Sequence, residues 1–507
     1  MDFLCLKVFI PEIFLSLSIL IQLFLNICTI TNFKNNYPII NVEIFSQCFF
    51  ILCCLFVLSV NDKIEAYFFN FLFSQDLSVF FVKMLIILSS IFSLLPILRG
   101  FVSQNLNFFE YYSIFLISLL STLLLVCSSN LLSIYLVLEM QTLSFYILAS
   151  FKRNSAFSTE AGLKYFVVGS FISGLFLFGF SNIYGLTGTL NFNGLKLLFD
   201  LPFLDNAFVY YNFLQLSVLV ITVVFLFKVS AVPFHFWSPD VYEGSPLSST
   251  IIFSIIPKFA VFYLFLKWLL VVDNFSNIKN LLLICGIFSI FVGSFMALKQ
   301  KRLKRLIIYS SIAQTGFLLV ALSINNLNSF VSIFFFLIIY IITSILIWTM
   351  FSLFFSFQNK INIFFDKLNY PLFLSTLSSF FKINKIWSVS NIIIFFSLAG
   401  IPPLVGFFSK LFIISVIVDY KDLYCSFILL IVSAVSVFYY LRIIKIIFFD
   451  KNLNIKIESS QIIFNDDFFI LECIFLSFFL FLLVFLFFYP SVFVLGCFLT
   501  VSNFFLF

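Results

Sequence analysis

The chain has 507 residues, of which 63% are hydrophobic and only 10% are charged, and its formal net charge is +6. Soluble globular domains contain about 25% charged residues, so this composition excludes a soluble fold. Apolar runs of about 20 residues recur along the whole chain, which predicts membrane-spanning helices rather than the alternating segments of a β-barrel. We therefore expect an all-α integral membrane protein with one membrane domain, because no long polar stretch is available to fold outside the bilayer.

The first residues, MDFLCLKVFIPEIFLSLSIL, lack the pattern of a cleavable leader, since acids occur early and the apolar run is long enough to span. They also lack the Arg- and Ser-rich composition of a transit peptide. If the protein works in an organelle, we expect that it is made there.

The residues that bind metals and cofactors are scarce. The ten cysteines lie mostly inside apolar runs and form no C-x-x-C pattern, so they are expected to be small buried hydrophobic residues. The single histidine, His235, excludes bis-histidine haem ligation within this chain. There is no Gly-rich phosphate loop. We therefore predict no metal, no cofactor and no redox centre in this chain.

Fourteen apolar runs are predicted to span the membrane. In chain order they cover residues 9–30, 45–60, 77–98, 112–127, 131–151, 161–184, 213–239, 247–271, 281–298, 306–324, 330–354, 388–418, 424–447 and 468–489. The apolar tail 491–507 is expected to lie along the interface. Between the eleventh and twelfth spans, the amphipathic segment 358–387 predicts a helix at the membrane surface.

The basic residues of the loops support this count. Loops after odd-numbered spans collect most of the lysines and arginines, with the densest cluster in ALKQKRLKRL at 297–306. The other loops and the N-terminus hold few. By the positive-inside rule the basic side faces the cytoplasm or the mitochondrial matrix.

Several charges nevertheless fall inside spans, where each costs about 2.5–3.5 kcal/mol on insertion scales. Glu139 lies near the centre of the fifth span and has a short side chain. We expect it to face a buried base, the alternative being a carboxylic acid that is hydrogen-bonded to a neighbouring helix. Lys228 precedes Pro233, whose ring removes a backbone hydrogen bond and interrupts the seventh span. Such a break is tolerated where it lines protein or water, and its exposed helix ends can form an ion site; the alternative is a snorkelling lysine beside a harmless kink.

Two further lysines occupy equally costly positions. Lys258 directly follows a proline and has more than two turns of span on each side. Lys410 follows a second helix break, in SLAGIPPLVGFFSK at 397–410. Because each half of the chain carries a proline-broken span with a lysine, the sequence suggests an internal structural repeat.

Four other polar residues are less informative. Lys83 and Glu472 lie near span ends, where snorkelling suffices, and Lys267 beside Trp268 is expected to be an interfacial anchor. His235 is expected beyond the first break, toward a loop with Asp240 and Glu243. It is a structural residue or a proton shuttle near neutral pH.

Lysines in an apolar environment suit proton transfer. Burial disfavours the ammonium form, and a nearby carboxylate favours it again, so such a lysine can gain and lose a proton at physiological pH. Arginine stays charged and cannot do this. The sequence therefore predicts a proton relay that contains Glu139, Lys228, Lys258 and Lys410, with His235 as a further candidate.

Five stretches carry a family resemblance: KVSAVPFHFWSPDVYEGSP, IIPKFAV, LKRLIIYSSIAQTGF, SLAGIPPLVGFFSK and VSVFYYLRIIKIIFFD. Together they resemble the subunit 2 family of mitochondrial NADH:ubiquinone oxidoreductase (respiratory complex I). That family is similar to its bacterial and plastid counterparts, and more distantly to the Mrp-type cation/proton antiporters. The match is dense over residues 130–450 and weak toward both ends.

The resemblance implies an antiporter-like fold of about fourteen helices, with two inverted five-helix repeats and broken seventh and twelfth helices. It implies that Glu139 pairs with Lys228, that this interaction modulates the proton affinity of Lys258, and that protons then pass toward Lys410 and the intermembrane side. NADH oxidation and quinone reduction would take place in other subunits of the enzyme. The implied division is 1–110 for helices 1–3, 111–275 and 276–450 for the two repeats, and 451–507 for the last helix and tail.

We therefore expect a proton-translocating, multi-pass subunit of complex I in the mitochondrial inner membrane. Its expected partners are other membrane-arm subunits and lipids, and no nucleic acid. One alternative is an Mrp-like cation/proton antiporter, which sodium-dependent antiport by the isolated chain would favour. Another is a purely structural scaffold, but a scaffold should lose costly charges at the four relay positions.

Overall fold

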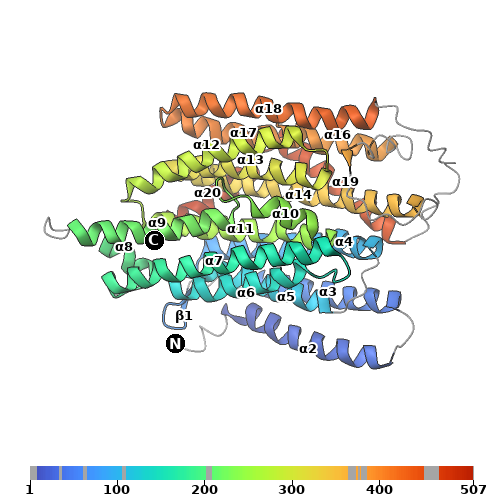
Figure 1. Cartoon of the computed structure of the whole chain (residues 1–507), viewed down its shortest axis with the longest axis horizontal. Coiled ribbons are helices and arrows are strands. Elements are labelled where there is room, and N and C mark those ends of the chain that lie inside the picture. Colours follow the sequence, from blue (N-terminus) through green and yellow to red (C-terminus); the bar gives the residue numbers. More distant parts are fainter. Residues whose placement is uncertain are drawn as a thin grey trace. The chain divides into compact units, whose positions relative to one another are not determined.

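The computed structural model describes residues 8–32, 37–60, 66–104, 110–200, 208–362, 373–374, 377, 385–449 and 467–505. Within these ranges the chain is helical apart from one short β-hairpin, so the expected all-α membrane architecture is confirmed (Figure 1). The chain divides into two compact units, one formed mainly by residues 1–281 and the other mainly by residues 282–499.

The first unit contains ten helices and the hairpin. They are α2 (Ile10–Asn32), α3 (Tyr37–Val60), β1 (Ala66–Phe68), β2 (Phe73–Gln75), α4 (Leu77–Gln104), α5 (Glu110–Cys127), α6 (Leu131–Ala149), α7 (Ala156–Thr187), α8 (Phe192–Phe199), α9 (Phe208–Lys228), α10 (Trp237–Gly244) and α11 (Leu247–Val271). Helix α11 is buried around its circumference and packs against α4, α5, α6, α8, α9 and α10. An apolar helix without a polar face belongs in a protein core or a membrane, and α11 is the core of this unit.

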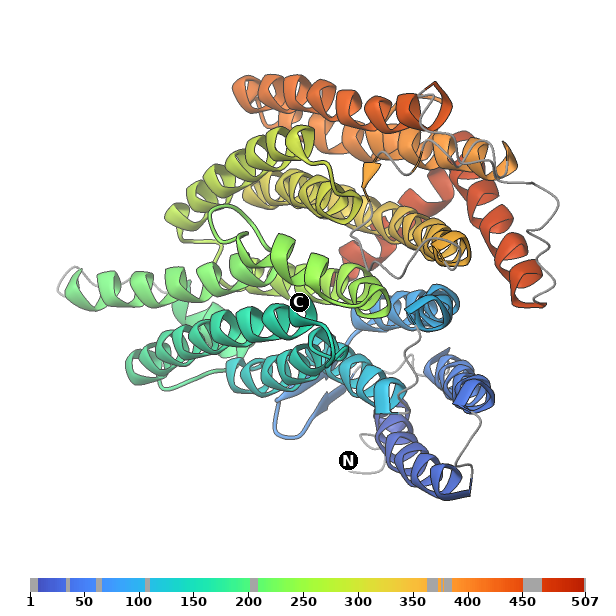
Figure 2. The same cartoon turned by 45° about the vertical axis from the view of Figure 1, so that its right-hand side comes forward.

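The second unit is built from the remaining helices. Helix α12 (Ser276–Lys299) leads into it, followed by α13 (Leu303–Ile324), α14 (Leu327–Asn362), α16 (Lys385–Ala399), α17 (Val405–Asp419), α18 (Leu423–Phe448), α19 (Asp467–Phe488) and α20 (Ser491–Phe505). Helix α17 packs against α13, α14, α16, α18 and α19, so the segment after the second proline cluster contacts five helices of this unit (Figure 2).

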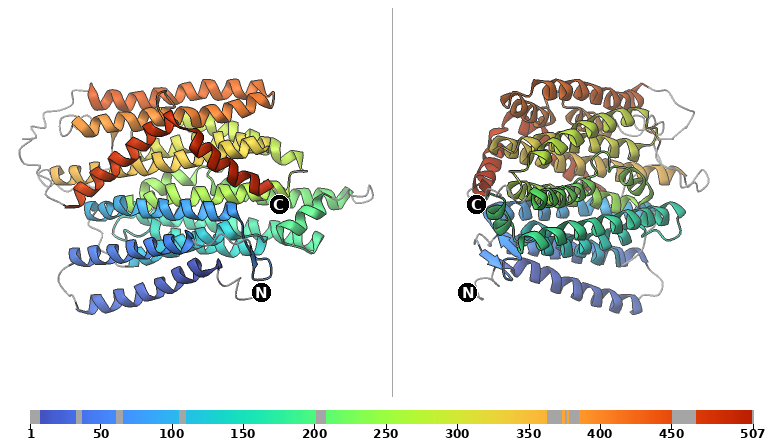
Figure 3. Two further views of the ribbon diagram at one scale, coloured as in Figure 1. Left: turned by 180° about the vertical axis from the view of Figure 1, so that it is seen from behind. Right: turned by 60° about the vertical axis from the view of Figure 1, so that its left-hand side comes forward.

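Nine helices of the described ranges are long and apolar enough to cross a membrane, or ten if the bent α19–α20 pair counts as one span. Four shorter apolar helical segments cover Ile10–Asn26, Ile44–Val60, Asn212–Lys228 and Lys385–Ala399. The count of fourteen spans and the inverted repeats therefore stay predictions. The tail forms helix α20, which is bent by 84° from α19 (Figure 3).

The two helix interruptions occur where the proline clusters predict them. Helix α9 ends at Lys228 and α10 begins at Trp237, whereas α16 ends at Ala399 and α17 begins at Val405. The acidic segment after the first break is the helix α10 and not the expected loop. The predicted surface helix at 358–387 falls mostly outside the described residues, although α14 continues as far as Asn362.

Candidate functional site

The first interruption places Lys228 at the end of a half-helix. Ser230 has a φ of +61°, which turns the chain out of the helix before the cis peptide bond between Val232 and Pro233. The helix therefore ends before the proline that predicted the break. Lys228 occupies the last turn of α9 and is partly exposed. A cation there faces the partial negative charge of the helix C-terminus, which stabilises it.

Trp237 holds this break in place. Its indole N–H donates a hydrogen bond to the carbonyl of Phe227 at 3.2 Å, and the backbone N–H of Ser230 donates to the same carbonyl at 3.0 Å, so this oxygen accepts two hydrogen bonds at the end of α9. The indole ring also stacks on Tyr165 of α7, with ring centroids 5.0 Å apart. The hydrogen bond and the ring stacking together attach Trp237 to α7 and to the end of α9, which stabilises the break beside Lys228.

Glu139 lies on α6 and is partly exposed. It interacts electrostatically with Lys228. The ion pairs found within 4.0 Å among the described residues do not include these two side chains. Helix α7 packs against both α6 and α9. The two charges therefore influence each other without direct contact, and a proton moving between them needs an intermediate carrier such as water.

Lys258 is buried in α11, with 8% of its surface exposed. Pro257, directly before it, has no N–H to donate to the carbonyl of Phe253 four residues earlier. The hydroxyl of Tyr242 donates to this carbonyl instead, at 2.9 Å. Helix α10, which follows the first break, is therefore attached to α11 close to Lys258. The role of Tyr242 was not predicted from the sequence. Its only sequence signal is that Pro257 leaves the Phe253 carbonyl without its helical donor and that a tyrosine lies nearby in the chain.

Lys410 connects the two halves of the second broken helix. Its ammonium donates to the carbonyl of Ala399, the last residue of α16, at 2.7 Å and to the hydroxyl of Ser436 on α18 at 3.2 Å. It also lies 5.9 Å from the ring centroid of Phe317 on α13. The lysine thus caps the C-terminus of one half-helix from its position on the other, which is a favourable place for a cation.

Two glycines make room for this arrangement. Gly400 has a φ of +79°, and a Cβ atom there would lie 3.0 Å from Cδ of Lys410. A Cβ atom on Gly406 would lie 1.7 Å from the carbonyl oxygen of Ser397, so α17 could not approach the end of α16. The glycines of the GIPPLVG stretch are therefore required by conformation and by close packing.

His235 lies in the turn between α9 and α10 and is buried, with 5% of its surface exposed. Its ring lies against Phe236, with centroids 4.4 Å apart, and its carbonyl accepts hydrogen bonds from Ser238. Asp240 belongs to α10 and pairs with Lys164 of α7 at 3.1 Å. Its carboxylate therefore helps to attach α10 to α7.

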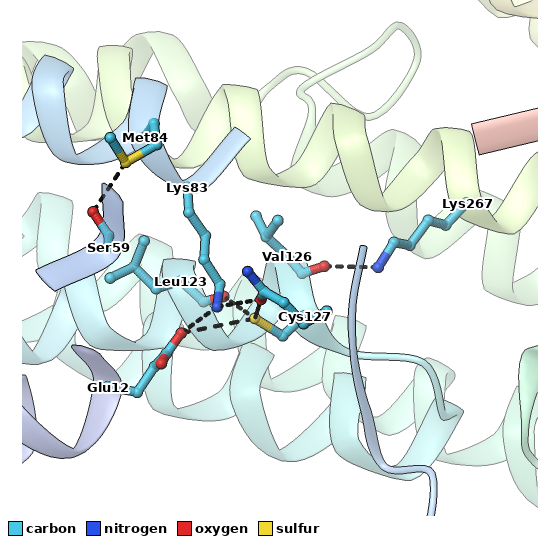
Figure 4. A network of polar contacts seen from close by, with 9 residues as sticks. Glu12, Ser59, Lys83, Met84, Leu123, Val126, Cys127 and Lys267 are labelled. Atoms are coloured by element: carbon cyan, nitrogen blue, oxygen red, sulfur yellow. Dashed lines mark hydrogen bonds and ion pairs between the residues drawn. The ribbon is translucent and has the colours of Figure 1, made fainter. Parts of the chain in front are cut away.

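The structure contradicts the expected positions of Lys83 and Lys267. Lys83 does not snorkel to a span end but is buried and pairs with Glu12 at 2.5 Å (Figure 4). Lys267 is not an interfacial anchor but is buried and donates to the carbonyl of Val126 at 2.8 Å. Glu472 is also buried, with 4% exposed. A position near the end of a predicted span did not make these side chains exposed, because neighbouring helices cover them.

Side chains of the relay candidates are divided between the two units. Glu139, Lys228, His235 and Lys258 belong to the first unit, and Lys410 belongs to the second. Among the residues that the structure describes, no three His, Cys, Asp or Glu side chains gather in a way that could hold a metal ion. The chemistry available at these positions is the transfer of protons between amines and a carboxylate.

Comparisons with known proteins identify the family of the chain. Residues 128–439 match a family model, which is described as "NADH:quinone oxidoreductase/Mrp antiporter, TM". NADH-ubiquinone oxidoreductase chain 2 of Marchantia polymorpha is 34% identical over 455 residues, which cover 89% of this chain and 89% of that protein. A chain of respiratory complex I from Thermus thermophilus is similar in fold, with a TM-score of 0.74 and 22% identity over 96% of this chain and 98% of that one. A chain of the Mrp complex from Dietzia sp. DQ12-45-1b has a TM-score of 0.79 and 16% identity, covering 98% of this chain and 97% of its own. The chain therefore belongs to the NADH:quinone oxidoreductase/Mrp antiporter transmembrane family.

Proposed function

We propose that the chain is the proton-translocating subunit 2 of the membrane arm of NADH:ubiquinone oxidoreductase, in the mitochondrial inner membrane. It is one subunit of a proton-translocating reductase, and the NADH and quinone reactions take place in other subunits. Neighbouring membrane-arm subunits and lipids cover its exposed apolar helix faces. The likeness to chain 2 proteins over most of both lengths supports this assignment.

The observation that carries the proposal is the burial of Lys258 in the central helix α11. A charge in such a helix is costly, and it is retained where it performs a function. A lysine can release its proton there, and the break around Pro233 provides polar backbone groups close to the same helix. Lys258 is accordingly the central proton carrier.

In the proposed mechanism, Lys228 and Glu139 control the charge of Lys258. A proton on Lys228 disfavours a second positive charge on Lys258, because like charges repel strongly in a medium of low dielectric constant. Glu139 offsets this repulsion when it is ionised. Movement of charge at Glu139 or Lys228 therefore changes the proton affinity of Lys258, which passes its proton on toward Lys410. His235 is a further proton carrier beside the first break.

The proposal extends to the number of membrane spans and to the two inverted repeats. The chain crosses the membrane fourteen times, with residues 111–275 and 276–450 forming two inverted repeats between the segments 1–110 and 451–507. The occurrence of one broken helix in each proposed repeat, α9–α10 and α16–α17, supports this division. In each case a lysine of the broken helix lies beside a half-helix end, as expected for a membrane ion site.

Proton pumping in Lys258→Met tests the proposal. In vesicles that contain the assembled complex, we expect NADH oxidation by uncoupled membranes to continue and the number of protons moved per electron to fall. Lys279→Met is the matched control, because Lys279 belongs to the same unit and pairs with Asp273 at 2.6 Å on the surface. Normal pumping by assembled Lys258→Met would refute the relay.

The second candidate is an Mrp-like cation/proton antiporter. The likeness in fold to the Dietzia Mrp chain supports this alternative. The two functions differ in what drives the proton, which is quinone reduction in one case and a cation gradient in the other. Sodium-driven proton movement by vesicles that lack NADH would favour the antiporter, whereas movement that requires NADH and quinone would favour the complex I subunit.

A further inference from the structure

A second cluster of charged and polar side chains is buried in the first unit, outside the residues 128–439 that the family model matches. It joins Glu12 of α2, Gln75 at the end of β2, Lys83 of α4 and Cys127 at the end of α5. Figure 4 labels Glu12, Lys83 and Cys127 of this cluster. Exposed surface is only 3% for Glu12, 2% for Gln75, 4% for Lys83 and 2% for Cys127. These four side chains form the Glu12–Lys83 cluster.

The side chains of the cluster meet at two side-chain oxygen atoms, and the Cys127 thiol also donates to the carbonyl of Leu123 at 3.3 Å. The ammonium of Lys83 lies 2.5 Å from Oε1 of Glu12 and donates to Oε1 of Gln75 at 2.7 Å. The thiol of Cys127 lies 3.9 Å from Oε1 of Glu12 and 4.0 Å from Oε1 of Gln75. One ammonium is thus balanced by one carboxylate, so the cluster is electrically neutral as a whole when both groups are ionised.

The second carboxylate oxygen distinguishes the cluster from an ordinary ion pair. Oε2 of Glu12 and the amide nitrogen of Gln75 are buried and have no hydrogen-bond partner among the residues that the structure describes. A buried polar atom without a partner is costly, and a structural pair is expected to have its remaining lone pairs satisfied. Oε2 of Glu12 is therefore a position where a proton can bind while Lys83 keeps its contact with Oε1.

Lys267 connects this region with the central lysine of the proposed relay. It belongs to α11, the helix that carries Lys258, and lies nine residues farther on, about 14 Å along the helix axis. It donates to the carbonyl of Val126, the neighbour of Cys127, and it interacts electrostatically with Cys127, Lys83 and Asp76. A second basic residue on α11 therefore lies beside the Glu12–Lys83 cluster.

The surroundings of Lys267 supply further polar groups. Its ammonium lies 5.1 Å from the ring centroid of Tyr263, one turn back toward Lys258 on α11. The hydroxyl of Tyr263 is hydrogen-bonded to Ser78 of α4 at 2.8 Å. On the other side, Asp76 directly follows Gln75 and is only partly buried. Polar side chains thus extend from the interior of α11 to a carboxylate that reaches the surface of this unit.

The ends of the helices indicate the side of the membrane. Glu12 and Lys83 lie near the starts of α2 and α4, whereas Cys127 and Lys267 lie near the ends of α5 and α11. In the predicted topology all four ends lie on the side with few lysines and arginines in its loops. By the positive-inside rule this side is opposite the cytoplasm or matrix, and in the proposed function it is the side to which protons are delivered.

We propose that the Glu12–Lys83 cluster and Lys267 form a proton-release branch, which takes protons from Lys258 and delivers them to the side opposite the basic loops. The proposal rests on the proposed function of Lys258. The neutral amine of Lys267 binds a proton and becomes an ammonium. It then gives the proton to Oε2 of Glu12 through a water molecule or through the Cys127 thiol, which takes up one proton as it releases another. The Glu12 carboxylic acid returns to the carboxylate when the proton leaves past Asp76.

The first test is Lys267→Arg in the assembled complex. Arginine keeps the positive charge and can donate to the carbonyl of Val126, but it does not release a proton. We expect normal assembly and normal NADH oxidation by uncoupled membranes, with protons per electron lowered, but by less than in Lys258→Met, because the route from Lys258 toward Lys410 stays open. The control is Lys279→Arg, at an exposed lysine of the same unit. Normal pumping by assembled Lys267→Arg would overturn the release branch.

The second test separates a proton site from a structural ion pair. Glu12→Gln and Lys83→Met each leave one buried charge without its partner and are expected to reduce the amount of assembled complex. The double variant leaves no unpaired charge, so assembly is expected to recover while protons per electron stay low. Recovery of both assembly and pumping would show that the pair is only structural.

These outcomes are distinguishable from failure of the proposed function. If the Lys267 and double variants pump normally and Lys258→Met does not, the release branch is wrong and the relay through Lys258 stands. If Lys258→Met also pumps normally, the proposed function itself is wrong. If the double variant fails to assemble, Lys267→Arg alone decides about the branch.

Discussion

The hydroxyl of Tyr242 donates a hydrogen bond to the carbonyl of Phe253 at 2.9 Å, and this is the carbonyl that Pro257 deprives of its helical partner. The proline beside Lys258 is thus compensated by a side chain from α10, the short helix after the first break. The geometry of the broken helix and the geometry around the central lysine are therefore coupled by one contact within the first unit.

Tyr242→Phe removes this donor and keeps the aromatic ring beside Phe253. The Phe253 carbonyl then lacks a partner in a buried position, which is expected to cost about 1–3 kcal/mol. We expect a lower melting temperature of the assembled complex and fewer protons per electron. Tyr424→Phe is the control, because Tyr424 is 87% exposed. Unchanged stability and pumping in Tyr242→Phe would show that the contact is unimportant.

Trp237→Phe tests the contact that holds the first break. The variant keeps an aromatic ring against Tyr165 but loses the N–H that is bonded to the Phe227 carbonyl. We expect a loss of about 1 kcal/mol in stability and reduced pumping, because Lys228 follows Phe227 directly. Trp237→Leu, which also loses the ring stacking, should be worse. Equal stability of the two variants would assign no role to the stacking.

Gly400→Ala tests the second break. An alanine there must adopt a left-handed backbone and bring its Cβ atom against Lys410, at an expected cost of about 1–3 kcal/mol. We expect reduced pumping by the complex that assembles, because the side chain displaces Lys410 from Ala399. Gly185→Ala is the matched control, since a Cβ atom in that helix meets nothing within 4 Å. It should be neutral or slightly stabilising. A Gly400 variant as stable and active as this control would refute the steric argument.

Two substitutions of Lys410 distinguish the role of its positive charge from the role of its exchangeable proton. Lys410→Arg keeps a cation beside the end of α16, whereas Lys410→Met removes it. Since arginine does not release its proton, we expect both variants to lower protons per electron, with Lys410→Arg assembling better. Lys445→Met, at an exposed position of α18, should behave as the native chain. Full pumping by Lys410→Arg would limit Lys410 to a structural role.

Glu139→Gln tests action at a distance within the first unit. Because Glu139 influences Lys228 without an ion pair, its neutral variant is expected to assemble normally. Pumping should still fall, since the charge that offsets the protonated lysine is lost. Glu160→Gln is the control, because Glu160 forms an exposed pair with Lys164 at 2.8 Å. Loss of assembly in Glu139→Gln alone would indicate a structural role for this carboxylate.

The sequence by itself determined the class of the protein and the positions of its two helix breaks. Composition and the length of apolar runs depend only on local chemistry, since about 20 apolar residues are needed to cross a bilayer whatever their neighbours are. Proline acts locally too, because its ring removes a hydrogen bond within its own helix. Lys228, Lys258 and Lys410 could be singled out in the same way, by the cost of a charge within an apolar run.

Only the tertiary structure decided which groups these residues meet. Lys267 and its acceptor at Val126 are 141 residues apart, and no local pattern connects them. The sequence placed Lys83 and Lys267 in water or at the interface, whereas packing of α2, α4, α5 and α11 buries both. Burial depends on which helices pack together, and hydrogen-bond partners depend on how those helices are rotated. For this reason the Glu12–Lys83 cluster and the Tyr242 contact emerge only from the folded chain.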